Sequence, residues 1–127
     1  MRFRAGRSKL VDMSDPDCLF CKIVSREIPG DIVFENEHAL AFRDIAPAAP
    51  VHVLVVPKQH LPNAVAVAES DADLSAELVR VAGQVAAAEG LDNGYRLVFN
   101  TGADAQQTVF HAHLHVLGGR AMGWPPG

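Results

Sequence analysis

Three histidines stand at every second position near the end of this sequence, in the stretch QTVFHAHLHVLGG, residues 107–119. Successive side chains of a β-strand point to opposite faces, so His111, His113 and His115 would share one face. The apolar residues of the stretch would face the core: Phe110, Ala112, Leu114 and Val116. Neighbouring histidines would lie about 6.6 Å apart along this strand. The pattern predicts a strand with one core face and one chemical face.

The residues alone leave three interpretations of this histidine row. The imidazoles could form the polar outer face of an edge strand. Two of them could bind a zinc ion that polarises a water molecule for hydrolysis. A neutral imidazole nitrogen could instead attack phosphorus and form a transient phosphohistidine. The regular register beside apolar residues favours chemistry over a plain surface.

Cys18 and Cys21 form a Cys-x-x-Cys pair near the start of the chain. Such a pair can be a redox pair, half of a metal site, or two reduced buried thiols. No strand precedes it in a thioredoxin-like pattern, which argues against the redox interpretation.

Composition narrows the class of protein. The chain has 127 residues, 49% hydrophobic and 20% charged, which is typical of one soluble globular domain. The net charge of −4 argues against general nucleic-acid binding, which needs a basic surface. No apolar stretch approaches the roughly 20 residues that cross a bilayer, so we expect no membrane association.

The first 13 residues differ from the rest, because Arg2, Arg4, Arg7 and Lys9 supply four of the eleven basic residues. We expect residues 1–13 to form a flexible basic arm and residues 14–127 to form a single domain. The arm lacks the apolar segment of a secretory signal, so we expect a cytoplasmic protein.

The remaining sequence predicts the elements that must position these side chains. Helix-start signals at Asp15 and Pro16, and a stop at Pro29 and Gly30, indicate a short first helix. Apolar steps of three and four residues predict a long helix from Asp71 to about Glu89. Strands are expected on both sides of the turn 35–37, at 51–57, from Tyr95 to about Asn100, and at the histidine row. The prediction is an α+β domain: a five-stranded, mainly antiparallel sheet with one short and one long helix. We also expect Trp124 to pack against a surface, which the sequence does not identify.

The stretch HAHLHVLGGR has the His-x-His-x-His-x-x pattern, with x apolar, and resembles the histidine triad (HIT) superfamily of nucleotidyl hydrolases and transferases. FCKIVSREIPGDIVFENE, ALAFRDIAPAAPVHVLVVPKQHL, GYRLVFNTG and GGRAMGWPPG are similar to its Hint branch, the nucleoside phosphoramidate hydrolases. The ending WPPG separates that branch from diadenosine-polyphosphate hydrolases and galactose-1-phosphate uridylyltransferases. The resemblance covers all but the arm, and it implies a homodimer in which two five-stranded sheets join.

The resemblance also implies the roles of four residues. His113 would be the nucleophile. His115 would contact the α-phosphate and help protonate the departing amine, aided by the hydroxyl of Thr108. His52 would support the triad through hydrogen bonds. Histidine suits these roles because it titrates near neutrality.

A nucleotide pocket follows from the same resemblance. Asp44 would bind the ribose hydroxyls, and four apolar side chains would enclose the base: Phe20, Ile23, Phe42 and Ile45. Asn100 would reach the ribose or phosphate side, and backbone N–H groups around Gln107 and Thr108 would bind phosphoryl oxygens. Trp124 would complete its own pocket or that of the neighbouring subunit.

Many bacterial relatives carry the Cys-x-x-Cys pair as part of a structural zinc site, and the resemblance implies four ligands here: Cys18, Cys21, His60 and His111. Such a site is closed and leaves no position for a catalytic water. The alternative is that both cysteines are reduced core residues and His60 lies at the surface.

One departure from the Hint pattern concerns the loop before the triad. Ala105-Gln106-Gln107-Thr108 stands where the branch has Gly-Gly-Gln-Ser, so the hydroxyl is kept but the freedom of two glycines is lost.

We therefore expect a purine nucleoside phosphoramidate hydrolase without an organic cofactor, cleaving AMP–amine conjugates through a nucleotidyl-histidine. The alternatives are a dinucleoside polyphosphate hydrolase and a non-catalytic nucleotide-binding regulatory or scaffold protein.

Overall fold

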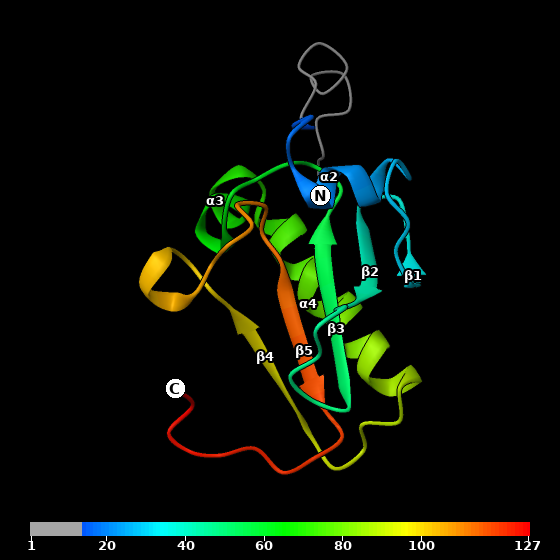
Figure 1. Cartoon of the computed structure of the whole chain (residues 1–127), viewed down its shortest axis with the longest axis vertical. Coiled ribbons are helices and arrows are strands. Elements are labelled where there is room, and N and C mark those ends of the chain that lie inside the picture. Colours follow the sequence, from blue (N-terminus) through cyan, green and yellow to red (C-terminus); the bar gives the residue numbers. More distant parts are fainter. Residues whose placement is uncertain (1–13) are drawn as a thin grey trace.

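The structure, a computed structural model, describes residues 14–127, and the predicted basic arm lies outside this range. Five strands form one antiparallel sheet in the order β1-β2-β3-β5-β4 (Figure 1). The strands are β1 (Ile32–Glu35), β2 (Ala39–Arg43), β3 (Val51–Pro57), β4 (Tyr95–Phe99) and β5 (Leu114–Gly118). The helices are α2 (Leu19–Val24), α3 (Ala64–Ser70) and α4 (Ala72–Ala88), with a short 3₁₀ turn, η1, at Ala103–Ala105. The α+β prediction with a five-stranded antiparallel sheet is confirmed.

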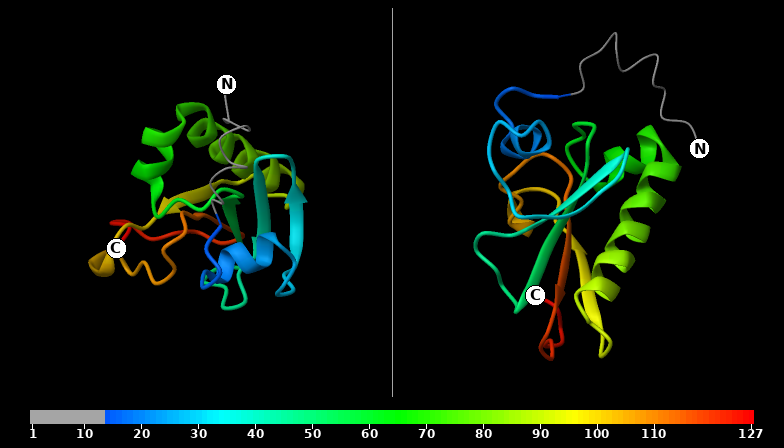
Figure 2. Two further views of the ribbon diagram at one scale, coloured as in Figure 1. Left: turned by 90° about the horizontal axis from the view of Figure 1, so that it is seen from above. Right: turned by 90° about the vertical axis from the view of Figure 1, so that its right-hand side faces the viewer.

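The helix α4 lies along one face of the sheet, and the short helix α2 lies over one end of the other face (Figure 2). The strand β3 shows why its sequence, VHVLVVP, is almost continuously apolar. Val53 and Val55 belong to the core under α4, whereas Leu54 and Val56 belong to the core under α2. Because alternate side chains face opposite layers, a strand that is buried on both sides needs apolar residues throughout.

The long helix α4 agrees with its predicted bounds. Asp71 is its N-cap, and the Asp71 side chain accepts a hydrogen bond from the Asp73 amide. Six residues of α4 are buried against the sheet: Leu74, Leu78, Val81, Ala82, Val85 and Ala86. None of the helices in residues 14–127 has the length and apolar character that a membrane span requires.

The histidine row is only partly a strand, because β5 begins at Leu114. The ladder with β3 stops there for two reasons. Pro57 has no N–H to donate, and the Ala112 amide turns to the Leu61 carbonyl instead, at 2.7 Å. The prediction that Phe110 faces the core is wrong, since it precedes the strand and is 58% exposed.

Two further predictions are corrected by the helices. The helix α3 was not expected, since AVAVAES alternates like a strand; Asn63 caps it by accepting from the Ala66 amide. The first helix begins at Leu19 rather than near Asp15, because Cys18 is its N-cap and accepts from the Cys21 amide.

The C-terminal tail carries an exposed tryptophan. Trp124 is 82% exposed, so no surface within residues 14–127 of this chain covers it, and its contact with a neighbouring subunit stays a prediction. The tail is held through its backbone, because Arg96 donates to the Gly123 carbonyl at 2.8 Å.

Candidate functional site

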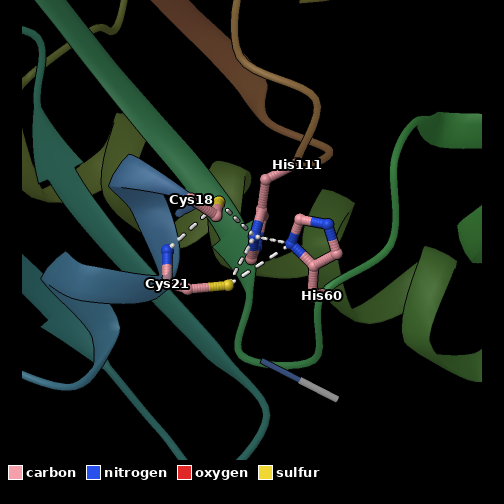
Figure 3. Close-up of side chains that lie close together, drawn as sticks. All are labelled: Cys18, Cys21, His60 and His111. Atoms are coloured by element: carbon pink, nitrogen blue, oxygen red, sulfur yellow. Dashed lines mark hydrogen bonds between the residues drawn. The ribbon is translucent and has the colours of Figure 1, made fainter. Parts of the chain in front are cut away.

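Two cysteines and two histidines converge where α2 meets the segments that follow β3 and precede β5 (Figure 3). The His111 Nδ1 atom lies 3.5 Å from the sulfur of Cys18 and 3.5 Å from that of Cys21. The His60 Nδ1 atom lies 3.3 Å from the Cys21 sulfur and 3.1 Å from the His111 Nδ1. We call these four residues the metal cluster; they are the four ligands that the sequence predicts.

The spacing of the metal cluster fits a tetrahedral zinc site. Bonds of about 2.3 Å to sulfur and 2.0–2.1 Å to nitrogen set the distances between ligand atoms at about 3.3–3.8 Å. The distances of 3.1, 3.3 and 3.5 Å lie at or just below that range. The His111 Nε2–H also donates to the Pro57 carbonyl at 2.8 Å, which leaves Nδ1 unprotonated and turned toward the sulfurs. Metal-binding histidines usually make this outer contact.

Burial sets the protonation of the metal cluster in the free protein. Burial lowers the pKa of His111 to about 4, so its imidazole is neutral, which is the form that binds metals. Burial raises the pKa of the Cys21 thiol to about 11, so this thiol must lose a proton when a cation binds. The cluster can therefore hold zinc, and four protein ligands would leave no open position on it.

His113 carries its proton on the opposite ring nitrogen from His111, although the two histidines are only two residues apart. Its Nδ1 lies 2.8 Å from the His111 carbonyl, and a carbonyl can only accept, so Nδ1 carries the proton. The other nitrogen, Nε2, is then bare, and it makes no hydrogen bond within residues 14–127. Burial lowers the pKa of His113, which keeps the imidazole neutral. The result is an unprotonated nitrogen that is available as a nucleophile.

His52 and His115 form a directed pair of hydrogen bonds beside it. The Ala48 amide donates to the His52 Nδ1 at 2.9 Å, so the His52 proton is on Nε2. That Nε2–H donates to the His115 Nδ1 at 2.8 Å, which places the His115 proton on its own Nε2. The His115 Nε2 is buried without a hydrogen-bond partner among the described residues. Burial lowers the pKa of His115 to about 4, and it also lowers the pKa of His52.

We call His52, His113 and His115 the histidine cluster. The rings of His113 and His115 lie 4.9 Å apart between centroids, and the rings of His52 and His115 lie 5.1 Å apart. The His113 ring offers a lone pair and the His115 ring offers an unpaired N–H. Together they suit a substrate that is attacked at one atom and needs a proton donor at a neighbouring atom.

Asp44 brings a carboxylate to this cluster. Its Oδ2 lies 3.4 Å from the His52 Nε2, and its Oδ1 accepts from the Ala46 amide at 2.9 Å. Asp44, His52 and His115 are close enough together to hold a cation. The hydrogen bonds place a proton on the His52 Nε2, however, so this set is better suited to hydrogen bonding.

A pocket of about 490 Å³ lies between α2 and the end of β2. Six predicted nucleotide-site residues line it: Phe20, Ile23, Phe42, Asp44, Ile45 and Thr108. Phe20 links this pocket to the histidine cluster, since its ring stands edge-on to Phe42 at 5.4 Å and to His113 at 5.0 Å. Phe20, which lines this apolar pocket, is thus in ring contact with His113, although no residue of the histidine cluster itself lines the pocket.

In the loop before the triad, Gln106 stands where the family pattern has a glycine, and it adopts the left-handed conformation that a glycine would favour. Gln106 has φ 69 and ψ 31, a left-handed conformation that costs a non-glycine residue about 1 kcal/mol. Gln107 is buried, its amide donates to the Gly102 carbonyl, and its side chain bonds to Gly102, Pro62 and Val109. Gln107 therefore braces the loop, and the binding of phosphoryl oxygens by backbone N–H groups around Gln107 and Thr108 stays a prediction.

Five predicted nucleotide-site residues do not line the pocket: Asn100, Gln107, His113, His115 and Trp124. Asn100 directly follows β4; Phe99 pairs with Leu114, so one further step would set Asn100 opposite His113. Neither Asn100 nor Trp124 lines the pocket of this chain.

Several residues that line the pocket were not predicted from the sequence. The pocket is also lined by Leu19, Ile28, Gly30, Leu54 and Val109. A β-carbon on Gly30 would lie 3.0 Å from Ile23, so this glycine keeps the pocket wall open. The carbonyls of Pro57 and His111 and the Ala48 amide set the imidazole tautomers, and backbone groups leave no signal in side-chain patterns.

Comparison with known proteins places this geometry among relatives. The family model described as HIT domain matches residues 25–122. An uncharacterised HIT-like protein of Synechococcus elongatus is 51% identical over 111 residues, which are 87% of this chain and 97% of that protein. A crystal structure of a HIT family hydrolase from Legionella pneumophila has 52% identity and a TM-score of 0.84, covering 87% of this chain and all of that one. A histidine triad nucleotide-binding protein from Candida albicans has 31% identity and a TM-score of 0.75, covering 86% and 83% of the two chains.

Proposed function

This chain belongs to the HIT domain family, and we propose that it is a purine nucleoside phosphoramidate hydrolase. It would cleave the P–N bond of an AMP–amine conjugate to give AMP and the free amine. The name of the Legionella relative supports hydrolysis, and the name of the Candida relative supports nucleotide binding. The WPPG ending supports the phosphoramidate branch over the dinucleotide branch.

One observation carries the proposal: adjacent imidazoles of the histidine cluster present complementary nitrogens. His113 offers a bare Nε2 because its Nδ1–H is used by the His111 carbonyl. His115 offers a buried Nε2–H that has no partner among residues 14–127. A buried donor without a partner costs roughly 1–3 kcal/mol, a cost that a bound phosphoryl oxygen or amine would remove.

The first chemical step transfers the nucleotidyl group to His113. The Nε2 lone pair attacks phosphorus, the P–N bond breaks, and its electron pair remains on the amine nitrogen. The negative substrate beside His115 raises the pKa of that imidazole and favours its protonated form. His115 then gives its Nε2 proton to the departing amine.

The second step restores the enzyme. Water attacks phosphorus, and the P–Nε2 electron pair returns to His113. A proton of the water passes to His115, which closes the proton balance of the two steps. Before His115 is protonated, His52 keeps the His115 ring oriented, because its Nε2–H is bonded to the His115 Nδ1.

The pocket supplies binding for the nucleoside. Phe20 and Phe42 would enclose the purine, and the Asp44 carboxylate would accept hydrogen bonds from ribose hydroxyls. The metal cluster residues would hold a zinc ion whose contribution is to tie α2, which carries Phe20, to the triad segment. This leaves His113 and His115 free for the reaction.

Rates with two substrates test the proposal. We expect adenosine 5′-monophosphoramidate to give AMP and ammonia in equal amounts, at a kcat/KM well above that for diadenosine tetraphosphate. His38→Ala is a suitable control, since His38 is the one histidine of the chain outside both clusters; it should turn over like the wild type. Faster cleavage of the dinucleotide would favour the rival hydrolase, and AMP binding without turnover of either substrate would favour a non-catalytic role.

A further inference from the structure

The four residues of the metal cluster are not held equally. Cys18, Cys21 and His111 are 8%, 5% and 0% exposed. The His60 side chain is 22% exposed and borders a pocket of about 320 Å³. The His111 ring is also fixed by the Pro57 carbonyl at its far nitrogen. His60 is therefore the ligand whose orientation depends least on packing.

Asp15 contacts three of the four residues of the metal cluster, His60 among them. Its carbonyl accepts from the Cys18 amide at 3.0 Å, and its own amide donates to the Cys21 sulfur at 3.3 Å. Its carboxylate Oδ2 lies 3.9 Å from the His60 Nε2. Both Asp15 and Asp17 line the pocket that His60 borders. A single residue thus touches three members of the metal cluster.

The chemistry of metal-bound imidazole makes this placement meaningful. When Nδ1 of His60 binds a cation, the ring proton must be on Nε2, which is the nitrogen that faces Asp15. Metal-binding histidines usually donate this second N–H to a carboxylate, a carbonyl or water. The Asp15 side chain is 46% exposed, so it has room to rotate and shorten the 3.9 Å separation to a hydrogen bond.

We propose that Asp15 is a positioning residue of the metal site. Its carboxylate accepts a hydrogen bond from the His60 Nε2–H, and its amide stabilises the Cys21 thiolate by donating a hydrogen bond to the sulfur. The Asp15 carboxylate would orient His60 in the same way that the Pro57 carbonyl orients His111. The inference goes beyond the proposed reaction, since it concerns metal affinity and involves none of the histidine cluster.

Zinc affinity, measured by competition with a chromophoric chelator, tests this role without reference to activity. Asp15→Asn keeps both backbone contacts and nearly the same shape, and we expect its zinc dissociation constant to rise about 10- to 100-fold. Asp17→Asn is the matched control, because it removes the same charge from the same pocket. Its affinity should stay within about twofold, as expected for a screened surface charge. An unchanged affinity in Asp15→Asn, or an equal loss in both variants, would overturn the proposal.

Two further variants guard against a merely structural effect. Asp15→Glu keeps a carboxylate and should recover most of the lost affinity, even if Asp15→Asn folds poorly. In a His60→Ala background, Asp15→Asn should cause at most a small additional loss, because the partner of the carboxylate is absent. Failure of Asp15→Glu to recover affinity, a full additional loss in the His60→Ala background, or absence of zinc binding by the wild type would each contradict the assignment.

Discussion

His111 and His113 are separated by a single residue, yet the metal cluster and the histidine cluster prepare them for opposite tasks. In His111, Nε2 donates to a carbonyl and the bare Nδ1 faces two sulfurs. In His113, Nδ1 donates to a carbonyl, and the bare Nε2 makes no hydrogen bond within residues 14–127; Phe20, which lines the apolar pocket, stands edge-on to this ring. Both imidazoles are buried, and burial lowers both pKa values.

The difference between the two rings therefore comes from which nitrogen a backbone carbonyl occupies, since the residue type and the burial are shared. A carbonyl acceptor selects the tautomer of each ring. The tautomer then decides whether the nitrogen lone pair faces the thiols or is left without a hydrogen-bond partner.

Removing each imidazole in turn should break the comparison most sharply. We expect His113→Ala to lower kcat by at least about a thousandfold while AMP and zinc binding persist, because only the nucleophile is lost. We expect His111→Ala to lose zinc and stability. Turnover assays, AMP titration and zinc content measure the two outcomes, and His38→Ala serves as the shared control. Normal turnover in His113→Ala would contradict the assignment.

Zinc removal should act on stability through the metal cluster. A ligand present at a hundredfold excess over its dissociation constant stabilises the folded state by about 2.7 kcal/mol, so chelation should lower Tm by roughly 10 °C. Differential scanning calorimetry before and after chelation measures this change. A Cys18→Ser variant should respond much less to the chelator. Equal responses of both proteins would show that the metal binds elsewhere.

His52→Ala should test the histidine cluster without removing a reacting group. The variant loses the donor to the His115 Nδ1, so the tautomer and orientation of His115 are no longer selected. We expect kcat to fall about 10- to 100-fold with little change in KM. His52→Gln, which restores an N–H donor, should recover part of kcat. A rise in KM with kcat unchanged would instead point to a role in substrate binding.

The lowered pKa of His115 predicts a pH-dependent contribution to stability. The value falls from 6.5 to about 4 in the folded chain, so the unfolded chain binds more protons between these values. The contribution is complete above pH 6.5 and is lost as pH falls toward 4. Because the ring is only partly shielded from water, we expect a loss of about 1 kcal/mol between pH 7.5 and 5. Urea unfolding should show this loss in the wild type relative to His115→Gln, and parallel pH profiles would argue against it.

Much of the fold could be predicted from local pattern. The strand β3 and the helix α4 have strong periodicity and clear caps, and their bounds agree with prediction to within about a residue. The helix α3 was missed because Ala and Val alternate along it and only Val67 is buried. The start of β5 was missed because it depends on Pro57 and on a hydrogen bond to Leu61, which lie far from the strand in sequence.

The candidate site shows the same limit. The side chains of the metal cluster could be named from the sequence through family resemblance, and the structure brings them together. The tautomers could not be predicted, because they depend on the carbonyls of Pro57 and His111 and on the Ala48 amide. The contacts of Asp15 were missed for a related reason, since two of its three contacts to the metal cluster use its backbone.

A rapid-quench experiment tests whether His113 is the nucleophile. The protein is mixed with a phosphoramidate substrate in a single turnover, quenched under conditions that preserve phosphorus–nitrogen bonds, digested, and mapped by mass spectrometry. The account predicts a transient nucleotidyl group on the peptide that contains residue 113, with fragmentation placing it on His113. A group found on another histidine, or turnover at full rate with no labelled peptide at any time point, would contradict it.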